Sequence, residues 1–294
     1  MNIMIVGGTG SLGQKLLERY YKKENRIVVF SRDELKQANL KKKYPLINCI
    51  IGDIRQSESL SMAFDGIPYD IVFHCAALKH VDLGEENVSE FVETNYVGTK
   101  NLAHFCNVYK AEKLVFFTTD KAVFPINAYG MSKALAEKFL CQQNIFCRMN
   151  IYIFRWGNIL GSRGSVLDYF KKCFIDKQKL KITDLKCTRF WLLLDEAIDF
   201  VIDIIEDPYF MGVKGVHIPF MKAASLEVLA KSVYHVLKNR GHDLLPFEES
   251  YVELGLRPGE KFHENMFPEA IDLTSEDCEA FTMFELMQKI ERII

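Results

Sequence analysis

The sequence contains no long apolar run and no block of charge of one sign. No stretch approaches the roughly 18 consecutive apolar residues that a membrane helix requires, and the longest basic cluster is Lys41-Lys42-Lys43. The 37 Lys and Arg residues nearly balance the 39 Asp and Glu residues, and the formal net charge is −2. Because nucleic-acid binders gather basic residues on one face, we expect no nucleic-acid partner and no association with a membrane. Met1 leads directly into the apolar run Ile3–Val6, so we expect no signal peptide.

The eight cysteines form no CxxC pair and show no spacing typical of a zinc site. Most of them lie in apolar surroundings, as Cys75 does within residues 72–76. A free cysteine behaves as a small buried hydrophobic residue. We therefore expect reduced thiols in a soluble, cytoplasmic protein, and no metal site.

The length and the hydrophobic pattern predict the fold class. With 294 residues, 49% of them hydrophobic, the chain can build one large domain or two smaller ones. Apolar, β-branched runs alternate with segments of helical spacing in the first half of the chain. The runs are Ile3–Val6, Ile27–Phe30, Ile47–Ile51, Ile71–Phe73, Leu114–Phe117 and Ile151–Phe154. This alternation predicts an α/β fold with a doubly wound parallel sheet that is covered by helices on both faces.

The alternation of strands and helices becomes less regular beyond Arg155, where two amphipathic helices are predicted at 194–205 and 226–236. Glycine, proline and polar segments separate these helices. We expect a Rossmann-type dinucleotide-binding domain over residues 1–155 and a smaller substrate-binding lobe over residues 156–294. Some elements of the lobe should return to complete the sheet.

A glycine-rich turn, Gly7-Gly8-Thr9-Gly10-Ser11-Leu12-Gly13, follows the first predicted strand and opens the first helix. Glycines allow a tight turn, let backbone N–H groups approach a diphosphate, and let the helix pack closely on the strand. A glycine motif alone is weak evidence, but the strand before it and the helix after it favour a dinucleotide site over a structural turn. The residues predicted to bind the cofactor here are Gly7, Thr9, Gly10, Ser11, Leu12 and Gly13.

The end of the second predicted strand bears on the choice of cofactor. An NAD site places an acid there to bind the ribose 2′-hydroxyl, whereas this strand ends in Ser31 and Arg32. A hydroxyl and a guanidinium suit a 2′-phosphate. Asp33 follows at once and could serve as the acid instead. The sequence therefore favours NADP over NAD and leaves both open.

Two groups of polar residues are candidates for catalysis. Tyr129 and Lys133 are four residues apart at the start of a predicted helix, so both lie on one face. A nearby ammonium lowers the pKa of a phenol, which would help Tyr129 to remove a hydroxyl proton. The predicted strand Leu114–Phe117 leads into Thr118-Thr119-Asp120-Lys121, and ligands of open α/β sheets bind at the carboxyl ends of strands. A simple alcohol dehydrogenase needs neither the acid nor the lysine at this position.

The stretch Thr118–Lys133 resembles the extended short-chain dehydrogenase/reductase family, and within it the UDP-N-acetylglucosamine 4,6-dehydratases that invert C5. Related dehydratases that retain C5 have a membrane region and generally a methionine in place of Tyr129, which favours the soluble inverting branch. Segments along most of the chain support the resemblance: Ser31–Glu34, Gly52–Arg55, His74–Val81, Gly157-Asn158, Gly161–Ser165, Thr188–Trp191 and Arg257–Lys261.

The resemblance implies dehydration of UDP-N-acetylglucosamine at C4–C6 with inversion at C5, giving UDP-2-acetamido-2,6-dideoxy-β-L-arabino-hexos-4-ulose for glycan biosynthesis. NADP would stay tightly bound and be regenerated in each turnover. Tyr129, supported by Lys133 and Thr119, would take the C4 hydroxyl proton. Lys121 would be the base at C5, and Asp120 would protonate the departing C6 hydroxyl. Burial and Lys133 would lower the pKa of Lys121, whereas Asp120 would raise it, and the sequence leaves the balance open.

The resemblance also implies further ligand contacts and an assembly. Three other functions stay open: a retaining 4,6-dehydratase, a UDP-hexose 4-epimerase that needs no Asp–Lys pair, and a non-catalytic NADP-sensing module. We expect a homo-oligomer, a dimer or larger. Additional cofactor contacts would come from Asp53, Ile54, Ala76, Ala77, Lys79 and Asn95. Substrate contacts would come from Lys79, His80, Asn158, Arg163, Arg189, Arg257 and Glu260, with the arginines at 189 and 257 clamping the diphosphate.

Overall fold

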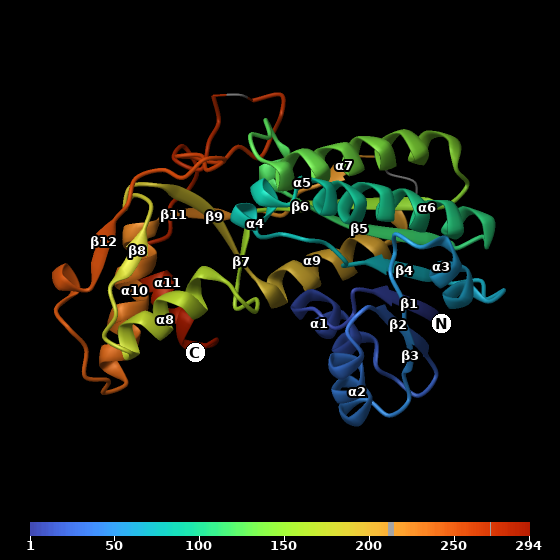
Figure 1. The fold of residues 1–294 in the computed structure, drawn as a ribbon, viewed down its shortest axis with the longest axis horizontal. Coiled ribbons are helices and arrows are strands. Elements are labelled where there is room, and N and C mark those ends of the chain that lie inside the picture. Colours follow the sequence, from blue (N-terminus) through green and yellow to red (C-terminus); the bar gives the residue numbers. More distant parts are fainter. Residues whose placement is uncertain (211–214, 271) are drawn as a thin grey trace. The chain divides into compact units, whose positions relative to one another are not determined.

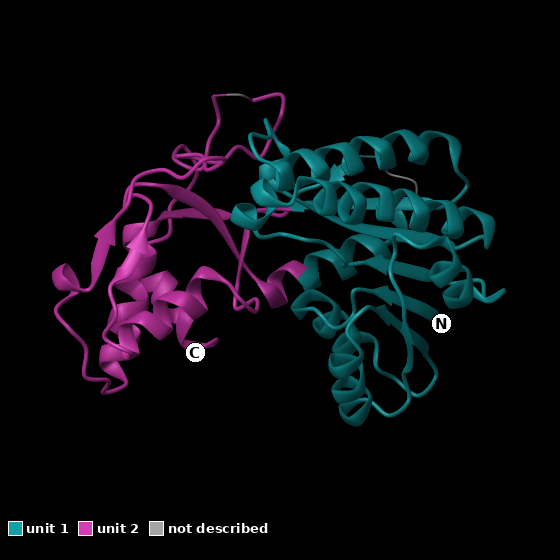
Figure 2. Ribbon diagram, viewed as in Figure 1, with its two compact units in different colours: residues 1–155, 198–218 teal, residues 156–197, 219–294 magenta. Residues whose placement is uncertain are grey.

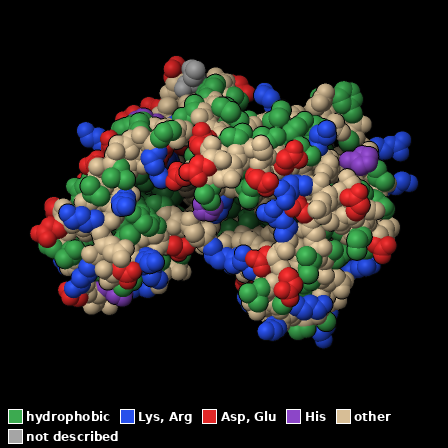
Figure 3. All heavy atoms as spheres, viewed as in Figure 1, with side chains coloured by type: hydrophobic (Ala, Val, Ile, Leu, Met, Phe, Trp, Pro, Cys, Tyr) green, Lys and Arg blue, Asp and Glu red, His purple; other side chains and the backbone are tan. Residues whose placement is uncertain are grey.

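The computed structural model describes residues 1–210, 215–270 and 272–294. Two compact units make up the chain (Figure 2): residues 1–155 with 198–218, and residues 156–197 with 219–294. Within the described ranges, no helix is both long enough and apolar enough to cross a bilayer. Acidic and basic side chains are interspersed on the face shown in Figure 3 rather than gathered by sign.

A seven-stranded sheet forms the centre of the first unit (Figure 1), in the order β10-β6-β5-β4-β1-β2-β3. Its strands are β1 (Asn2–Val6), β2 (Arg26–Ser31), β3 (Asn48–Ile51), β4 (Ile71–His74), β5 (Lys113–Thr119), β6 (Asn150–Trp156) and β10 (Val216–His217). The pairings of β1 with β2 and β4, of β2 with β3, of β4 with β5 and of β6 with β10 are parallel. A segment far along the chain thus supplies the strand beside β6.

Helices connect these strands. They are α1 (Ser11–Tyr20), α2 (Glu34–Lys43), α3 (Ser57–Phe64), α4 (Val81–Glu86), α5 (Val88–Val92), α6 (Gly98–Val108), α7 (Ala128–Phe146) and α9 (Leu194–Glu206). A π-helical turn, η1 (Glu93–Val97), separates α5 from α6, and β5 leads into a 3₁₀ turn, η2 (Asp120–Ala122). A second 3₁₀ turn, η3 (Pro208–Phe210), follows α9.

The sheet is covered on both faces. One face packs against buried side chains of α3, α6 and α7, such as Leu60, Leu102 and Leu140. On the other face, Tyr20 of α1 packs against Phe73, with ring centroids 5.5 Å apart, and α9 packs its Phe200 against β6. The predicted doubly wound parallel sheet is confirmed, and each of the six predicted strands is present with bounds shifted by at most two residues.

The second unit has its own core and two small sheets, β11-β9-β7 and β12-β8. Its buried side chains join α8, α10 and α11 around Phe170, Val233 and Leu286. The strands are β7 (Asn158–Leu160), β8 (Leu180–Ile182), β9 (Thr188–Leu193), β11 (Lys222–Ser225) and β12 (Tyr251–Glu253). The helices are α8 (Val166–Ile175), α10 (Leu226–Asn239) and α11 (Met283–Glu291), with a 3₁₀ turn η4 (Phe247–Glu249).

Candidate active site

The glycine-rich turn joins β1 to α1 and depends on two close approaches. Gly7 has φ +77°, and a Cβ on it would lie 2.6 Å from the backbone nitrogen of Ala76. A Cβ on Gly13 would lie 2.5 Å from the Cα of Gly8. Gly10 occupies the N-cap of α1, and the residues predicted from the turn, Thr9, Ser11 and Leu12, flank it. The turn can therefore bring the N-terminal backbone N–H groups of α1 close to an anion, which fits a dinucleotide diphosphate.

The charged residues after β2 have distinct local roles. Asp33 caps α2: its Oδ1 accepts from the backbone N–H of Lys36 at 2.9 Å, and its Oδ2 lies 2.6 Å from Nζ of Lys36. Arg32, whose side chain is 49% exposed, lies 3.5 Å from Oδ2 of Asp53. Burial opposes ionisation of Asp53, but hydrogen bonds and charge from Arg55 outweigh it and lower the pKa of this carboxyl. The structure thus uses Asp33 as a helix cap, and Arg32 and Arg55 both lie beside Asp53.

A buried glutamine that the sequence analysis missed positions Ser31. The Nε2 of Gln37 lies 2.8 Å from the carbonyl oxygen of Ser31, and 2.9 Å from both its Oγ and the carbonyl oxygen of Ile50. Gln37 therefore holds the ends of β2 and β3 together. Nearby, Ile54 is buried in the core against Gly98 at the start of α6. The segment Glu34–Lys43 is mostly polar, so nothing in the sequence distinguished Gln37 from its neighbours.

Asn95, which lies in the π-helical turn η1, ties the loop after β4 to α7. Its Oδ1 accepts from the backbone N–H of Leu78, and its Nδ2 donates to the carbonyl of Leu78, both at 2.9 Å. The same Nδ2 donates to Oγ of Ser132 on α7 at 3.0 Å. π-Helical turns are frequent at functional sites. The loop that Asn95 holds contains four predicted ligand contacts: Ala76, Ala77, Lys79 and His80.

An acid and a lysine meet where β5 ends. Asp120 is fully buried, and its Oδ1 accepts from Oγ1 of Thr119 at 2.8 Å and from the backbone N–H of Lys121 at 2.8 Å. The Nζ of Lys121 lies 3.1 Å from the same oxygen. Oδ2 of Asp120 is buried and has no hydrogen-bond partner among the described residues. The pair therefore stands at the carboxyl end of a central strand, with one carboxylate oxygen uncommitted.

The start of α7 packs directly on this pair. Asn127 caps the helix, since its Oδ1 accepts from the backbone N–H of Gly130 at 2.7 Å. A Cβ on Gly130 would lie only 2.1 Å from the carbonyl oxygen of Lys121. Only glycine permits this approach, which places Tyr129 next to the turn that carries Asp120.

Tyr129 is in electrostatic contact with the residues of this turn. Burial raises the pKa of Tyr129, the charge of Lys121 and a hydrogen bond with Thr119 lower it in part, and Asp120 raises it. The expectation that Lys133 lowers the pKa of this phenol is wrong for this structure. Burial dominates, and the lysine that acts on the phenol is Lys121.

Lys133 lies one helical turn further along α7 and is 3% exposed. Its Nζ is 3.9 Å from the ring centroid of Phe116 on β5. Burial lowers the pKa of Lys133 to about 7, against the opposing effects of Glu137 and Cys75. This lysine therefore changes charge near neutral pH.

The second unit contains the remaining predicted substrate residues. Asn158 begins β7, and Arg163 lies between β7 and α8. Arg257 and Glu260 lie after β12, with Nε of the arginine 3.3 Å from Oε2 of the glutamate. Glu260 also accepts from Oγ1 of Thr183 at 2.8 Å.

Arg189 on β9 is 5% exposed and holds the segment that contains Glu260. Its guanidinium donates to the carbonyl oxygens of Thr188 at 2.8 Å, Lys261 at 2.9 Å and Phe262 at 3.0 Å. It also lies 3.3 Å from Oε1 of Glu260. The structure thus brings Arg189, Arg257 and Glu260 into one network, in which Arg189 orders the backbone.

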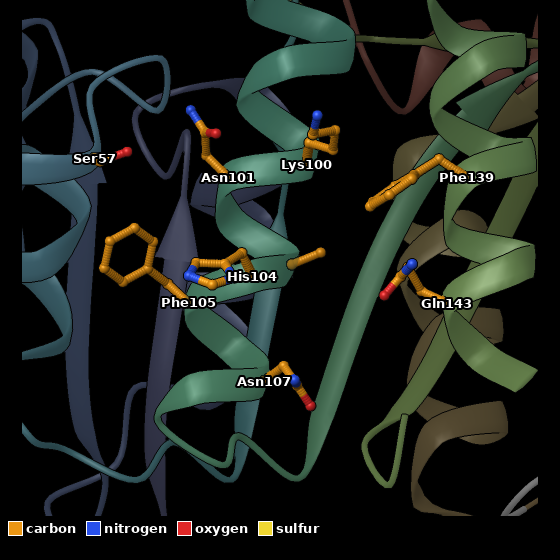
Figure 4. A pocket seen from close by; sticks show the side chains of 9 residues that line it. Ser57, Lys100, Asn101, His104, Phe105, Asn107, Phe139 and Gln143 are labelled. Atoms are coloured by element: carbon orange, nitrogen blue, oxygen red, sulfur yellow. The ribbon is translucent and has the colours of Figure 1, made fainter. Parts of the chain in front are cut away.

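A separate pocket of about 330 Å³ is lined by residues of α6 and α7 together with Ser57 (Figure 4). The side chains of His104, Phe105 and Phe139 line it. None of the predicted site residues is among those that line this pocket. It is distinct from the cluster at the end of β5.

Other kinds of site are not found in the described ranges. No group of three or more His, Cys, Asp or Glu residues there is placed to hold a metal ion. All eight cysteines lie in described segments and are unpaired.

Sequence comparison places the chain among known proteins. The polysaccharide biosynthesis protein family matches it over residues 3–285. The chain belongs to this family. One member, the UDP-N-acetylglucosamine 4,6-dehydratase (inverting) of Campylobacter jejuni subsp. jejuni, is 38% identical over 275 residues, which cover 90% of this chain and 77% of the relative. A protein of Rickettsia massiliae named UDP-glucose 4-epimerase is 35% identical over 278 residues, 90% of this chain and 76% of the relative. The family resemblance inferred from the motifs is confirmed.

Solved structures have a similar fold. Pen from Bacillus thuringiensis superposes with a TM-score of 0.87 at 30% identity, covering 98% of this chain and 96% of that one. The UDP-glucose 4-epimerase of Thermus thermophilus, solved with NAD, gives a TM-score of 0.79 at 19% identity, with 100% and 99% covered. At 19% identity, the likeness to the Thermus thermophilus structure shows a shared fold alone.

Proposed function

We propose that this protein is an NADP-dependent UDP-N-acetylglucosamine 4,6-dehydratase that inverts C5. The observation that carries the proposal is the contact between Asp120 and Lys121 beside Tyr129, at the carboxyl end of β5. Oxidation at C4 alone needs one base, which Tyr129 supplies. Elimination of water across C5 and C6 needs a second base and an acid. The 38% identity to inverting dehydratases supports the same activity.

The Asp120–Lys121 contact can supply both of these groups. Transfer of one proton across the 3.1 Å contact converts an ammonium and a carboxylate into an amine and a carboxylic acid. Lys121 is then able to take the C5 proton, and Asp120 is able to protonate the departing C6 hydroxyl. Return of a hydride to C6, which the reduced cofactor would supply, and of a proton to C5 from the opposite face would give the L-configured 4-keto-6-deoxy sugar nucleotide.

Tyr129 would take the proton of the C4 hydroxyl as C4 is oxidised to a ketone. The ketone then makes the hydrogen on C5 acidic. Thr119 also hydrogen-bonds the phenol, and a hydroxyl that donates to the phenolate stabilises it. The positive charge of Lys121 stabilises the phenolate against burial. Lys133 would support Tyr129 from the next turn of α7.

NADP is the cofactor that we propose, and the chemistry it supplies when bound is reversible hydride transfer. The turn Gly7–Gly13 would hold its diphosphate, and Ser31 and Arg32 would hold its 2′-phosphate. The use of Asp33 as a helix cap supports this preference, because both of its oxygens face Lys36. Further contacts would come from Asp53, Ile54, Ala76, Ala77, Lys79, Asn95, Tyr129 and Lys133.

We propose UDP-N-acetylglucosamine as the substrate. Arg257, whose side chain is 53% exposed, is the more accessible candidate for its diphosphate, and the buried Arg189 orders the segment that carries Glu260. The remaining proposed contacts are Lys79, His80, Asn158, Arg163 and Glu260.

Epimerisation at C4 is a second candidate function, because relatives named UDP-glucose 4-epimerase are 34–35% identical. An epimerase would use Tyr129 and Lys133 but not the Asp120–Lys121 pair. Incubation of the purified protein with UDP-N-acetylglucosamine separates the two functions. A product lighter by one water molecule indicates dehydration, and an unchanged mass with altered stereochemistry indicates epimerisation. NMR of the product at C5 distinguishes inversion from retention, and bound NADP without any turnover would instead indicate a sensing module.

We also propose that the protein works in the cytoplasm as a homo-oligomer, a dimer or larger. The unpaired state of all eight cysteines fits a reducing compartment. Light scattering on the purified protein over a range of concentrations tests the assembly, and a monomer throughout would contradict it. Cell fractionation tests the compartment.

A further inference from the structure

A buried ion pair lies one helical turn beyond Lys133. Glu137 of α7 and Arg155 of β6 make two hydrogen bonds, from Nη2 to Oε1 at 2.5 Å and from Nε to Oε2 at 3.3 Å. Their side chains are 11% and 6% exposed. Burying two charges costs about as much desolvation energy as their attraction returns, so such a pair is a weak source of stability. Its position next to a candidate catalytic lysine suggests a different role.

The spacing along α7 places Glu137 beside that lysine. Tyr129, Lys133 and Glu137 recur every four residues, so they share one face of the helix. Residues at this spacing have Cβ atoms about 5–6 Å apart. The carboxylate of Glu137 thus hydrogen-bonds Arg155 and also acts electrostatically on Lys133.

The other titratable groups that act on Lys133 come from the end of β4 and are neutral. Thr99 uses its O–H to donate to the carbonyl of Asn95, so its oxygen must accept the Nε2–H of His74 at 2.8 Å. Burial, with Lys133, lowers the pKa of His74 to about 3, and burial raises the pKa of the Cys75 thiol. Both side chains are therefore uncharged at neutral pH. Among the described groups that act on Lys133, Glu137 is the one that carries charge.

We propose that the Glu137–Arg155 ion pair sets the protonation state of Lys133. Glu137 stabilises the ammonium, and Arg155 limits that stabilisation by neutralising part of the carboxylate's charge. Both are positioning residues, since they act through Lys133 rather than on the substrate. The catalytic consequence rests on the role that the proposed function gives to Lys133.

Electrostatics predicts opposite effects from two variants that break the same ion pair. Burial lowers the pKa of Lys133 to about 7, and Glu137 is the largest influence acting against burial. Glu137→Gln removes the negative charge that acts against burial. The pKa of Lys133 therefore falls, and its ammonium loses a proton at a lower pH. Removing the positive charge with Arg155→Gln leaves the full carboxylate facing Lys133, so the ammonium persists to a higher pH.

Titration of the ¹³Cε signal of Lys133 by NMR tests this directly. The signal is assigned by its loss in Lys133→Arg. We expect the midpoint to fall by about 1 pH unit in Glu137→Gln and to rise in Arg155→Gln. A merely structural role would disturb both variants in the same direction. Midpoints that move together or stay unchanged would overturn the proposal.

Either single variant breaks a buried ion pair and could fail to fold. The double variant Glu137→Gln/Arg155→Met removes both charges and avoids this problem. Because Glu137, and not Arg155, is among the main influences on Lys133, the midpoint of the double variant should lie below that of the parent protein and above that of Glu137→Gln. An unchanged midpoint in a folded double variant contradicts the proposal. Glu227→Gln breaks an exposed i,i+4 pair with Lys231 on α10 and serves as the matched control, with no shift expected at Lys133.

The pH profile of turnover supplies a second readout. The part of this profile that reflects ionisation of Lys133 should shift to lower pH in Glu137→Gln and to higher pH in Arg155→Gln. If the parent protein does not dehydrate UDP-N-acetylglucosamine, the proposed function fails while the NMR titration still decides the electrostatic proposal. If the protein dehydrates UDP-N-acetylglucosamine normally but the two midpoints do not diverge, the proposed function stands and the electrostatic proposal fails.

Discussion

Asp120 and Lys121 are adjacent in sequence, and their side chains meet, with Nζ of the lysine 3.1 Å from Oδ1 of the aspartate. That oxygen also accepts from the hydroxyl of Thr119 and from the backbone N–H of Lys121, so the carboxylate has little freedom to rotate. The two groups therefore form one unit. Substitutions of the two residues should be strongly non-additive, because either one alone disables the exchange of a proton between them.

Replacing Lys121 by alanine should stop the loss of water while permitting some oxidation at C4. The variant lacks the proposed base at C5 and keeps Tyr129. We expect turnover to fall by about 10²- to 10⁴-fold, the range for loss of a general base. Mass spectrometry of the product measures dehydration, and the near-ultraviolet absorbance of reduced nicotinamide measures oxidation. Lys138→Ala, at an exposed position of α7, is the control. Undiminished dehydration in Lys121→Ala would remove Lys121 from the mechanism.

Replacing Arg32 by alanine should weaken NADP much more than NAD. Arg32 follows β2, and Asp33, the alternative ligand for a ribose hydroxyl, caps α2. Loss of a hydrogen bond to a charged group costs about 1.5–3 kcal/mol, so the Kd for NADP should rise about 10- to 100-fold. Titration of both dinucleotides into the protein measures this. Arg26→Ala, at the opposite end of β2, should change neither. Equal losses for NADP and NAD in Arg32→Ala would show that the 2′-phosphate lies elsewhere.

Replacing Gly130 by alanine should lower stability and activity together, although alanine favours helices more than glycine does. The new Cβ would meet the carbonyl oxygen of Lys121 at 2.1 Å, so α7 must move away from η2. We expect a loss of about 1–3 kcal/mol in the free energy of unfolding, as for other overpacked sites. Thermal denaturation measures it. Met131→Ala alters the next residue, which is 54% exposed, and should be nearly neutral. A Gly130→Ala protein as stable as the parent would contradict the close approach.

The buried His74 should make stability depend on pH below about 6.5. Burial lowers its pKa to about 3, so the unfolded chain binds a proton there that the folded protein rejects between these two values. Its contribution to stability is therefore full above pH 6.5 and is lost as the pH falls towards 3, by at most about 1.4 kcal/mol per pH unit. Urea denaturation on both sides of pH 6.5 should show a shallower dependence in His74→Gln than in the parent protein. His242→Gln, at an exposed position, should keep the slope of the parent protein.

The fold was predictable from the sequence because its determinants are local. Fully apolar strands such as Ile71–Phe73 lie between amphipathic helices, and a sheet buried on both faces requires that pattern. The position of Asp120 and Lys121 after a strand followed from the same pattern. The partners of Arg189 were not predictable, because they are backbone carbonyls of residues 261 and 262, more than 70 positions away along the chain.

The pKa of Tyr129 was predicted wrongly for a related reason. Spacing along a helix shows which side chains share a face, and it placed Lys133 beside the phenol. It does not show how deeply a face is buried or which neighbours from other elements touch it. Burial of Tyr129 and the approach of η2 through Gly130 decide the outcome, and both depend on tertiary packing.

The strand β10 has a practical consequence for dividing this protein into fragments. Residues 216 and 217 pair with β6, and α9 covers the same sheet with Phe200 against Phe154. A fragment cut after residue 155 would expose an unpaired backbone edge and an apolar face, the two surfaces through which truncated sheets self-associate. A soluble fragment of the first unit would therefore have to include residues 198–218, joined to the first 155 by a designed linker.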